Sequence, residues 1–169
     1  MGQPDYFQSL KSLRIIYFGQ STFTFDRFPA SLTELVLTPS PIDLEAVLDR
    51  LPAGLLKLDV TTDVLSDDMI ARLPRNLIHL DIKVPGRTRE NKLFSYSHDG
   101  LCDLPPRLQT LELSASPALL RPKMSAKSAL SLFPITLWYL NISFPDQGTL
   151  FWSTVIRDRL KQRLLAQPK

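Results

Sequence analysis

One short pattern, Leu-x-x-Leu-x-aliphatic, recurs along the chain of 169 residues and limits what this chain can fold into. The six copies begin at Leu10, Leu32, Leu55, Leu77, Leu108 and Leu137. Successive copies are 22, 23, 22, 31 and 29 residues apart. Self-similarity at a period of about 20–29 residues is typical of a solenoid, in which each repeat buries its apolar edge against the next. The pattern therefore predicts a stack of short strands.

A Leu-Pro or Phe-Pro pair precedes five of the six copies. These pairs are Phe28-Pro29, Leu51-Pro52, Leu73-Pro74, Leu104-Pro105 and Phe133-Pro134. Proline lacks a backbone N–H and pushes the residue before it out of the α region. Each pair is therefore expected to end a helix just before the strand begins. The predicted unit is strand, turn, helix, Leu-Pro and then the next strand.

The segments between the strands carry helical patterns. Residues 42–51 place one apolar stripe at helical spacing, at Leu44, Val47, Leu48 and Leu51. Residues 66–73 begin with Ser66 as an expected N-cap and an acidic first turn, followed by a short buried face at Met69, Ile70 and Leu73. A weaker third helix is expected over residues 123–132.

Together the six copies resemble leucine-rich repeats over residues 6–145. The resemblance implies an α/β fold: a curved solenoid with a parallel sheet on its concave face and short helices and turns on its convex face. The Leu-Pro lead-in is similar to that of bacterial effector repeats and of F-box-associated repeats, and residues 13–37 resemble an FNIP repeat. The family's ladder-forming asparagine is missing. Its positions hold Phe18, Ser40, Asp63, Pro85, Ser116 and Pro145.

Two parts of the chain are distinguished. Residues 1–147 are predicted to form the solenoid, with about six repeats and an insertion at residues 83–103. Residues 148–169 are predicted to form an amphipathic helix that caps the open end of the stack. This tail is basic: residues 157–169 carry a balance of +4, which leaves the other 156 residues at −1. Binding of the basic helix to an acidic membrane surface is the alternative interpretation.

The composition is ordinary for a globular protein, with 44% hydrophobic and 22% charged residues. No apolar run approaches the roughly 18–20 residues that span a bilayer, so a membrane location is not expected. The first fifteen residues lack the basic and apolar regions of a secretory signal. A single cysteine, Cys102, rules out an internal disulfide. A reducing compartment, the cytoplasm or the nucleus, is therefore expected.

Alternating strand residues should form two columns on the concave face, one residue per repeat. The first column is Arg14, Val36, Asp59, Asp81, Glu112 and Asn141, and the second is Ser12, Glu34, Lys57, His79, Thr110 and Tyr139. Consecutive carboxylates at strand spacing repel by about 1 kcal/mol per pair in water-like surroundings, and Lys57, His79 and Lys83 should offset part of this. The face is either an acidic groove for a basic or amide-rich partner or a solvated polar surface.

Nothing in the sequence favours catalysis. There is no glycine-rich phosphate loop and no metal-ligand spacing, and no cofactor is expected. Cys102 is expected to be a small buried residue. The insertion at 83–103 has basic residues followed by aromatics, but no stripe of positive charge continues from it. It is therefore interpreted as a plain excursion rather than a nucleic-acid contact.

The expected function is non-catalytic protein–protein recognition on the concave face, with the oligomeric state left open. The candidate partner-binding residues are Glu34, Lys57, Asp59, His79, Asp81, Lys83, Glu112, Tyr139 and Asn141. The resemblance implies one specific version, the substrate-recognition arm of a ubiquitin-ligase assembly. The alternatives are a recognition fragment of an enzyme or effector whose catalytic domain is absent from this chain, or a peripheral membrane protein that uses the basic tail.

Overall fold

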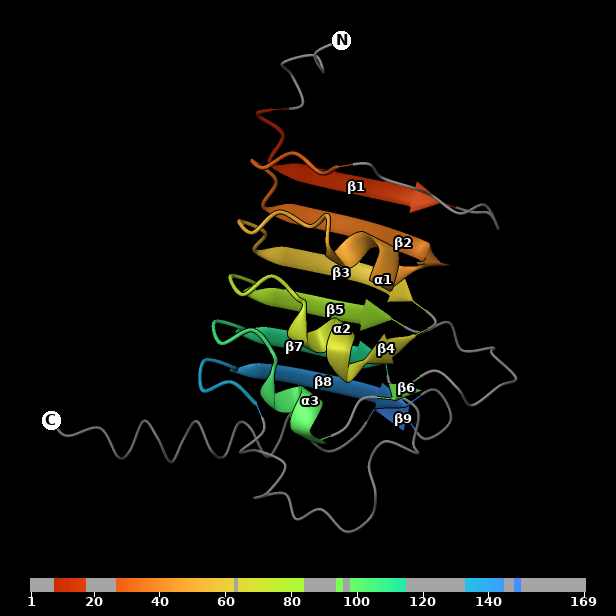
Figure 1. The fold of residues 1–169 in the computed structure, drawn as a ribbon. Helices are drawn as coiled ribbons and strands as arrows, with labels where there is room; N and C mark the ends of the chain where they lie inside the picture. Colours follow the sequence, from red (N-terminus) through yellow and green to blue (C-terminus); the bar gives the residue numbers. More distant parts are fainter. Residues whose placement is uncertain are drawn as a thin grey trace, which may run out of the picture.

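The computed structural model describes residues 8–17, 27–62, 64–83, 94–95, 98–114, 133–144 and 148–149. Six parallel strands lie side by side in chain order (Figure 1). They are β1 (Ser12–Tyr17), β2 (Glu34–Ile42), β3 (Lys57–Thr62), β5 (His79–Lys83), β7 (Thr110–Ser114) and β8 (Tyr139–Phe144). A short seventh strand, β9 (Gly148–Thr149), joins the edge antiparallel to β8. The parallel sheet with short helices confirms the α/β class.

The six motif copies occupy equivalent positions in the sheet. The second leucines of the motif pair along one row, formed by Leu13, Leu35, Leu58, Leu80, Leu111 and Leu140. From Leu35 onward these side chains are only 0–2% exposed, as predicted. Full burial of a leucine is worth about 1.5–3 kcal/mol, so this row is a main contributor to the stability of the sheet.

The Pro-x-x-Leu part of each copy forms a turn. In all five copies that contain it, the leucine N–H donates to the proline carbonyl, with N···O distances of 3.0–3.1 Å. The carbonyl that follows then accepts two N–H groups from the next repeat; Leu56 O, for example, accepts from the N–H groups of Ile78 and His79. The repeated sequence is therefore one turn that starts a strand and connects it to its neighbour.

Three short helices lie on the same side of the sheet (Figure 1). They are α1 (Leu44–Leu48), α2 (Asp67–Ala71) and α3 (His98–Cys102). The side chain of Asp43 caps α1 by accepting from the Ala46 N–H at 3.3 Å. The expected N-cap of α2 is confirmed, because Ser66 Oγ accepts from the Met69 N–H at 3.3 Å. The first helix is shorter than the predicted span of residues 42–51.

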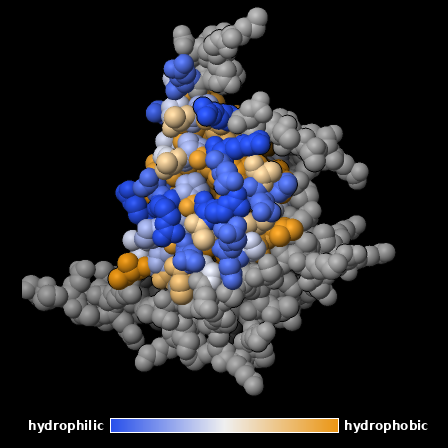
Figure 2. Space-filling model, in the orientation of Figure 1, coloured by the Kyte–Doolittle hydropathy of each residue, from blue (hydrophilic) through white to orange (hydrophobic). Residues whose placement is uncertain are grey.

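The core lies between the helices and the sheet. The predicted stripe residues of α1 (Leu44, Val47 and Leu48) and of α2 (Met69, Ile70 and Leu73) are buried there together with the motif leucines. The outer surface of this helix-bearing side is largely hydrophilic where it is described (Figure 2). No helix in the described ranges is long and apolar enough to cross a membrane.

Polar side chains at the second position after the proline bond back to the preceding repeat in three of the turns. Ser31 Oγ donates to Leu10 O at 2.8 Å, and Asn76 Nδ2 donates to Ala53 O at 3.0 Å. At the last repeat, Thr136 Oγ1 donates to Pro106 O at 2.9 Å. The turns of neighbouring repeats are therefore linked by side chains as well as by the sheet.

Two segments differ from the sequence-based prediction. The predicted excursion at residues 83–103 contains a strand, β6 (Phe94–Ser95), and the helix α3. β6 pairs with β4 (Leu65–Ser66) in a second, two-stranded sheet, and α3 packs beside α2, so this segment continues the stack. Gly148–Thr149 form a strand rather than the start of a helix. The predicted helix over residues 123–132 and the tail from residue 150 lie outside the described residues.

Candidate functional site

The sheet brings the predicted columns together on the face that points away from the helices, here called the outer sheet face. Its first column places Asp59 opposite Asp81, Asp81 opposite Glu112, and Glu112 opposite Asn141. Its second column consists of Ser12, Glu34, Lys57, His79, Thr110 and Tyr139. Both columns follow from the shared register, because a shift of one residue would exchange exposed and buried positions.

Lys83 bridges two carboxylates of the first column. Its Nζ lies 2.9 Å from Asp59 Oδ1 and 2.8 Å from Asp81 Oδ2. The two acids are partly withdrawn from solvent, with side-chain exposures of 17% for Asp59 and 27% for Asp81. Lys83 itself is 46% exposed, so its positive charge remains accessible from outside. Of the three residues expected to offset the acidic repulsion, Lys83 pairs with the column. Lys57 pairs with Glu34 instead, and His79 hydrogen-bonds to Thr110.

The pKa values of this cluster reflect the shortage of positive charge. Burial raises the pKa of Asp81, and the charges of Asp59 and Glu112 raise it further against the opposing hydrogen bond from Lys83. For Lys83, burial alone would lower the pKa, but hydrogen bonds to Asp81 and Asp59 outweigh it and raise the pKa. Among the described residues, one ammonium therefore pairs with two of the three neighbouring carboxylates, and the pKa of Asp81 stays raised.

The edge of the face near β1 and β2 is balanced. Lys57 Nζ lies 2.6 Å from Glu34 Oε1, and Ser12 Oγ donates to Glu34 Oε2 at 3.2 Å. The hydrogen bond from Lys57 lowers the pKa of Glu34, so this carboxylate stays ionised. Both side chains are exposed enough for solvent to screen the pair, and such pairs contribute little to stability.

The opposite edge of the face keeps more unbalanced negative charge. Glu112 accepts one hydrogen bond among the described residues, a long one of 3.5 Å from Asn141 Nδ2. The His79 ring hydrogen-bonds through Nδ1 to Thr110 Oγ1. The charged residues of the two columns, together with Lys83, are four acids and three cations, a net charge of −1. They are Arg14, Glu34, Lys57, Asp59, Asp81, Lys83 and Glu112.

Two exposed apolar side chains, Leu56 and Trp138, follow directly after a buried motif leucine. Trp138 with Tyr139 is the aromatic pair that the sequence offers as a candidate anchor for a partner. Trp138 is 54% exposed, and its ring meets that of Tyr139 edge to face with centroids 6.2 Å apart.

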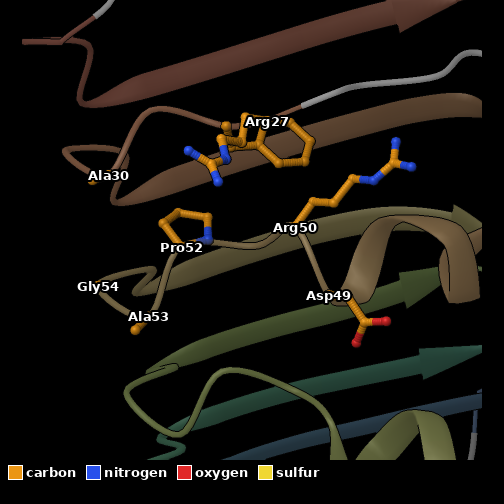
Figure 3. Close-up of a pocket in the computed structure, with 8 residues that line it drawn as sticks. Arg27, Ala30, Asp49, Arg50, Pro52, Ala53 and Gly54 are labelled. Carbon is orange, nitrogen blue, oxygen red and sulfur yellow. The ribbon is translucent and has the colours of Figure 1, made fainter.

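A pocket on the helix-bearing side offers no catalytic arrangement. It has a volume of about 460 Å³ and is lined by Arg27, Phe28, Ala30, Asp49, Arg50, Pro52, Ala53 and Gly54. In Figure 3 the side chains of Arg27 and Arg50 point to different sides and Asp49 points away from both. Arg72 of the next repeat holds that carboxylate, with Nη2 2.7 Å from Asp49 Oδ2. The charged groups therefore do not converge on a ligand.

The described residues also lack other signs of chemistry. No group of three or more His, Cys, Asp or Glu in the described part of the chain is placed to hold a metal ion. The prediction that Cys102 is buried is wrong: it is exposed, because it lies at the end of α3 on the side away from the sheet core. No protein-family model, curated protein or solved structure matches this chain.

Proposed function

We propose that this chain is a non-catalytic recognition module, a leucine-rich-repeat solenoid that binds a basic protein partner on its outer sheet face. The observation that carries the proposal is the column of Asp59, Asp81 and Glu112 on three neighbouring strands, in which Lys83 pairs with the first two acids and, among the described residues, no cation pairs with Glu112. Half-buried carboxylates with too little compensating charge gain free energy when a cation arrives. Charge-assisted hydrogen bonds to a partner are stronger there than on an open surface.

The surroundings of the column support binding rather than solvation alone. Interface centres are enriched in aromatic residues, and Trp and Tyr are frequent among the residues that dominate binding energy. Trp138 and Tyr139 lie at the Glu112 end of the face and remain exposed. An exposed tryptophan on the same face as the acidic residues is not expected if that face is polar only for solubility.

A triple substitution tests the proposal. Asp59→Asn, Asp81→Asn and Glu112→Gln remove three negative charges without changing shape, and the fold should be retained because repulsion is relieved. Partner capture from a native lysate should weaken at least tenfold, about 1.4 kcal/mol. A matched control removes three acids from the helix-bearing side, with Glu45→Gln, Asp49→Asn and Asp68→Asn. This control should capture the partner like wild type.

The two triple variants have the same net charge, so their comparison separates a local site from a general effect of charge. Equal capture by both, at wild-type strength, would show that recognition lies elsewhere on the chain. Equal loss by both would mean that only the overall charge matters. The ubiquitin-ligase version of the proposal rests on the repeat resemblance alone; recovery of ligase subunits with the captured partner is the result that supports it.

A further inference from the structure

The outer sheet face offers side chains but no backbone hydrogen-bonding groups. Each of its strands is paired on both sides along the sheet, apart from the two edges. A ligand on this face therefore cannot add itself as another strand, as peptides do at a free sheet edge. An occupant whose backbone loses water here must satisfy its own N–H and C=O groups. An α-helix does so internally, whereas an extended peptide does not.

The spacing of the acidic column also fits a helix. Neighbouring strands lie about 4.8 Å apart, so Asp59 and Glu112 are separated by about 9.6 Å. Two turns of a helix lying across the strands span about 10.8 Å, close enough for flexible Lys or Arg side chains to adjust. Alternate residues of an extended peptide are about 6.7 Å apart, so two steps give about 13 Å. The extended peptide falls out of register by about 4 Å.

An aromatic pair lies at one end of the acidic column. Tyr139 belongs to the second column of the outer sheet face, on the strand next to that of Glu112, and its ring contacts the ring of Trp138. Both side chains are exposed. A helix laid along the column therefore meets acids on three strands and an aromatic pair on the fourth.

We propose that the outer sheet face binds a basic amphipathic α-helix of its partner, laid across β3, β5, β7 and β8. Its basic flank pairs with Asp59, Asp81 and Glu112, one residue per turn and per strand. Its apolar flank packs against the Trp138–Tyr139 pair. This inference rests on the proposed function and narrows the partner to one chemical class.

Three synthetic peptides of about 18 residues, or five turns, test the geometry on the full chain. The first places arginine on one flank of a helix and leucine on the neighbouring flank. The second has the same composition in an order that scatters both residue types around the helix. The third alternates arginine and leucine for an extended backbone. Fluorescence anisotropy of labelled peptides should show that the first binds at least tenfold more tightly than either control and becomes helical by circular dichroism.

Substitutions on the protein locate the bound peptide. Trp138→Ala, at an exposed position, should weaken the amphipathic peptide at least threefold without changing the melting temperature. Glu112→Gln should weaken it too, and the effect should shrink at high salt, which screens exposed charge. The control Asp68→Asn on the helix-bearing side should leave affinity unchanged.

The outcomes separate this inference from the proposed function. Equal binding of all three peptides, abolished by the triple substitution of the acidic column, would overturn the helical geometry and keep the basic-partner site. Tighter binding of the alternating peptide would likewise overturn it. Peptide binding that ignores the triple substitution, together with unchanged partner capture, would overturn both.

Discussion

Leu80→Ala tests how far the stacked leucine row holds the sheet together. Leu80 is 2% exposed and lies in register between Leu58 on β3 and Leu111 on β7. The substitution removes three carbons of its side chain and leaves a cavity in the row. Leucine-to-alanine changes in cores cost about 2–5 kcal/mol, and the cost rises with the cavity that remains. Backbone ladders on both sides fix the strand spacing, so the site cannot collapse, and about 3–5 kcal/mol is expected.

Leu56→Ala is the matched control, because it deletes the same atoms at the surface. Leu56 is 36% exposed and has no place in the leucine row. The loss of partial burial alone should cost about 1 kcal/mol or less. The two variants therefore differ in packing and not in chemistry.

Urea denaturation and thermal melting followed by circular dichroism measure the difference. For a domain of this size, 1 kcal/mol corresponds to about 2–4 °C in melting temperature, so Leu80→Ala should melt about 6–20 °C below wild type. Leu56→Ala should lie within a few degrees of wild type. If the two variants lose the same stability, or Leu80→Ala melts like wild type, the leucine row is not the packed core that the register implies.

Two further substitutions test individual contacts. Gly100→Ala should destabilise the chain by about 1–3 kcal/mol, because a methyl group there would overlap the Asp67 carboxylate and push α3 from α2; Asp67→Ala in the same chain should restore the melting temperature. Asp81→Asn should leave stability at pH 7 unchanged or raised, because the folded state raises the pKa of Asp81 and so penalises its ionised form. This penalty exists above the folded pKa and disappears below the ordinary value of 3.8, so urea denaturation should show the gain at pH 7 and none at about pH 3. A gain that is larger in acid would contradict the assignment.

The strands and their register were predictable because each motif copy contains its own periodicity. Aliphatic residues two positions apart, such as Leu58 and Val60, must share a face, and the residue between them, Asp59, must lie on the other. Equal registers in successive repeats then align the intervening residues without further information. The acidic column is therefore predictable from the position of each acid within its own motif copy. The cap at Ser66 was predictable for a similar reason, since its signal is local.

Other features depend on contacts between repeats, which the sequence does not display. The side-chain bond between turns requires Asn76 to reach the Ala53 carbonyl 23 residues earlier, and the two residues come close only once the repeats are stacked. The helix α3 has the sequence His-Asp-Gly-Leu-Cys, which contains a helix-weakening glycine and a single apolar anchor. It forms because α2 lies beside it, with Asp67 fitted against Gly100. Tertiary packing there overrides local propensity, and the exposure of Cys102 follows from the same helix.

The acidic column shows how one arrangement affects both stability and binding. Asp81 is held beside two other carboxylates, so the free protein keeps a group whose ionised form is disfavoured. A cation from a partner would stabilise the ionised form of Asp81 and would also form its own hydrogen bonds. Both effects make the free energy of binding more favourable. Lys83 limits the repulsion in the free state, and its salt bridges are short. If a partner had to displace Lys83, most of the gain would be lost. The favourable position for a partner's cation is therefore beside Glu112, at the end of the column that Lys83 does not reach, next to Tyr139 and the exposed Trp138.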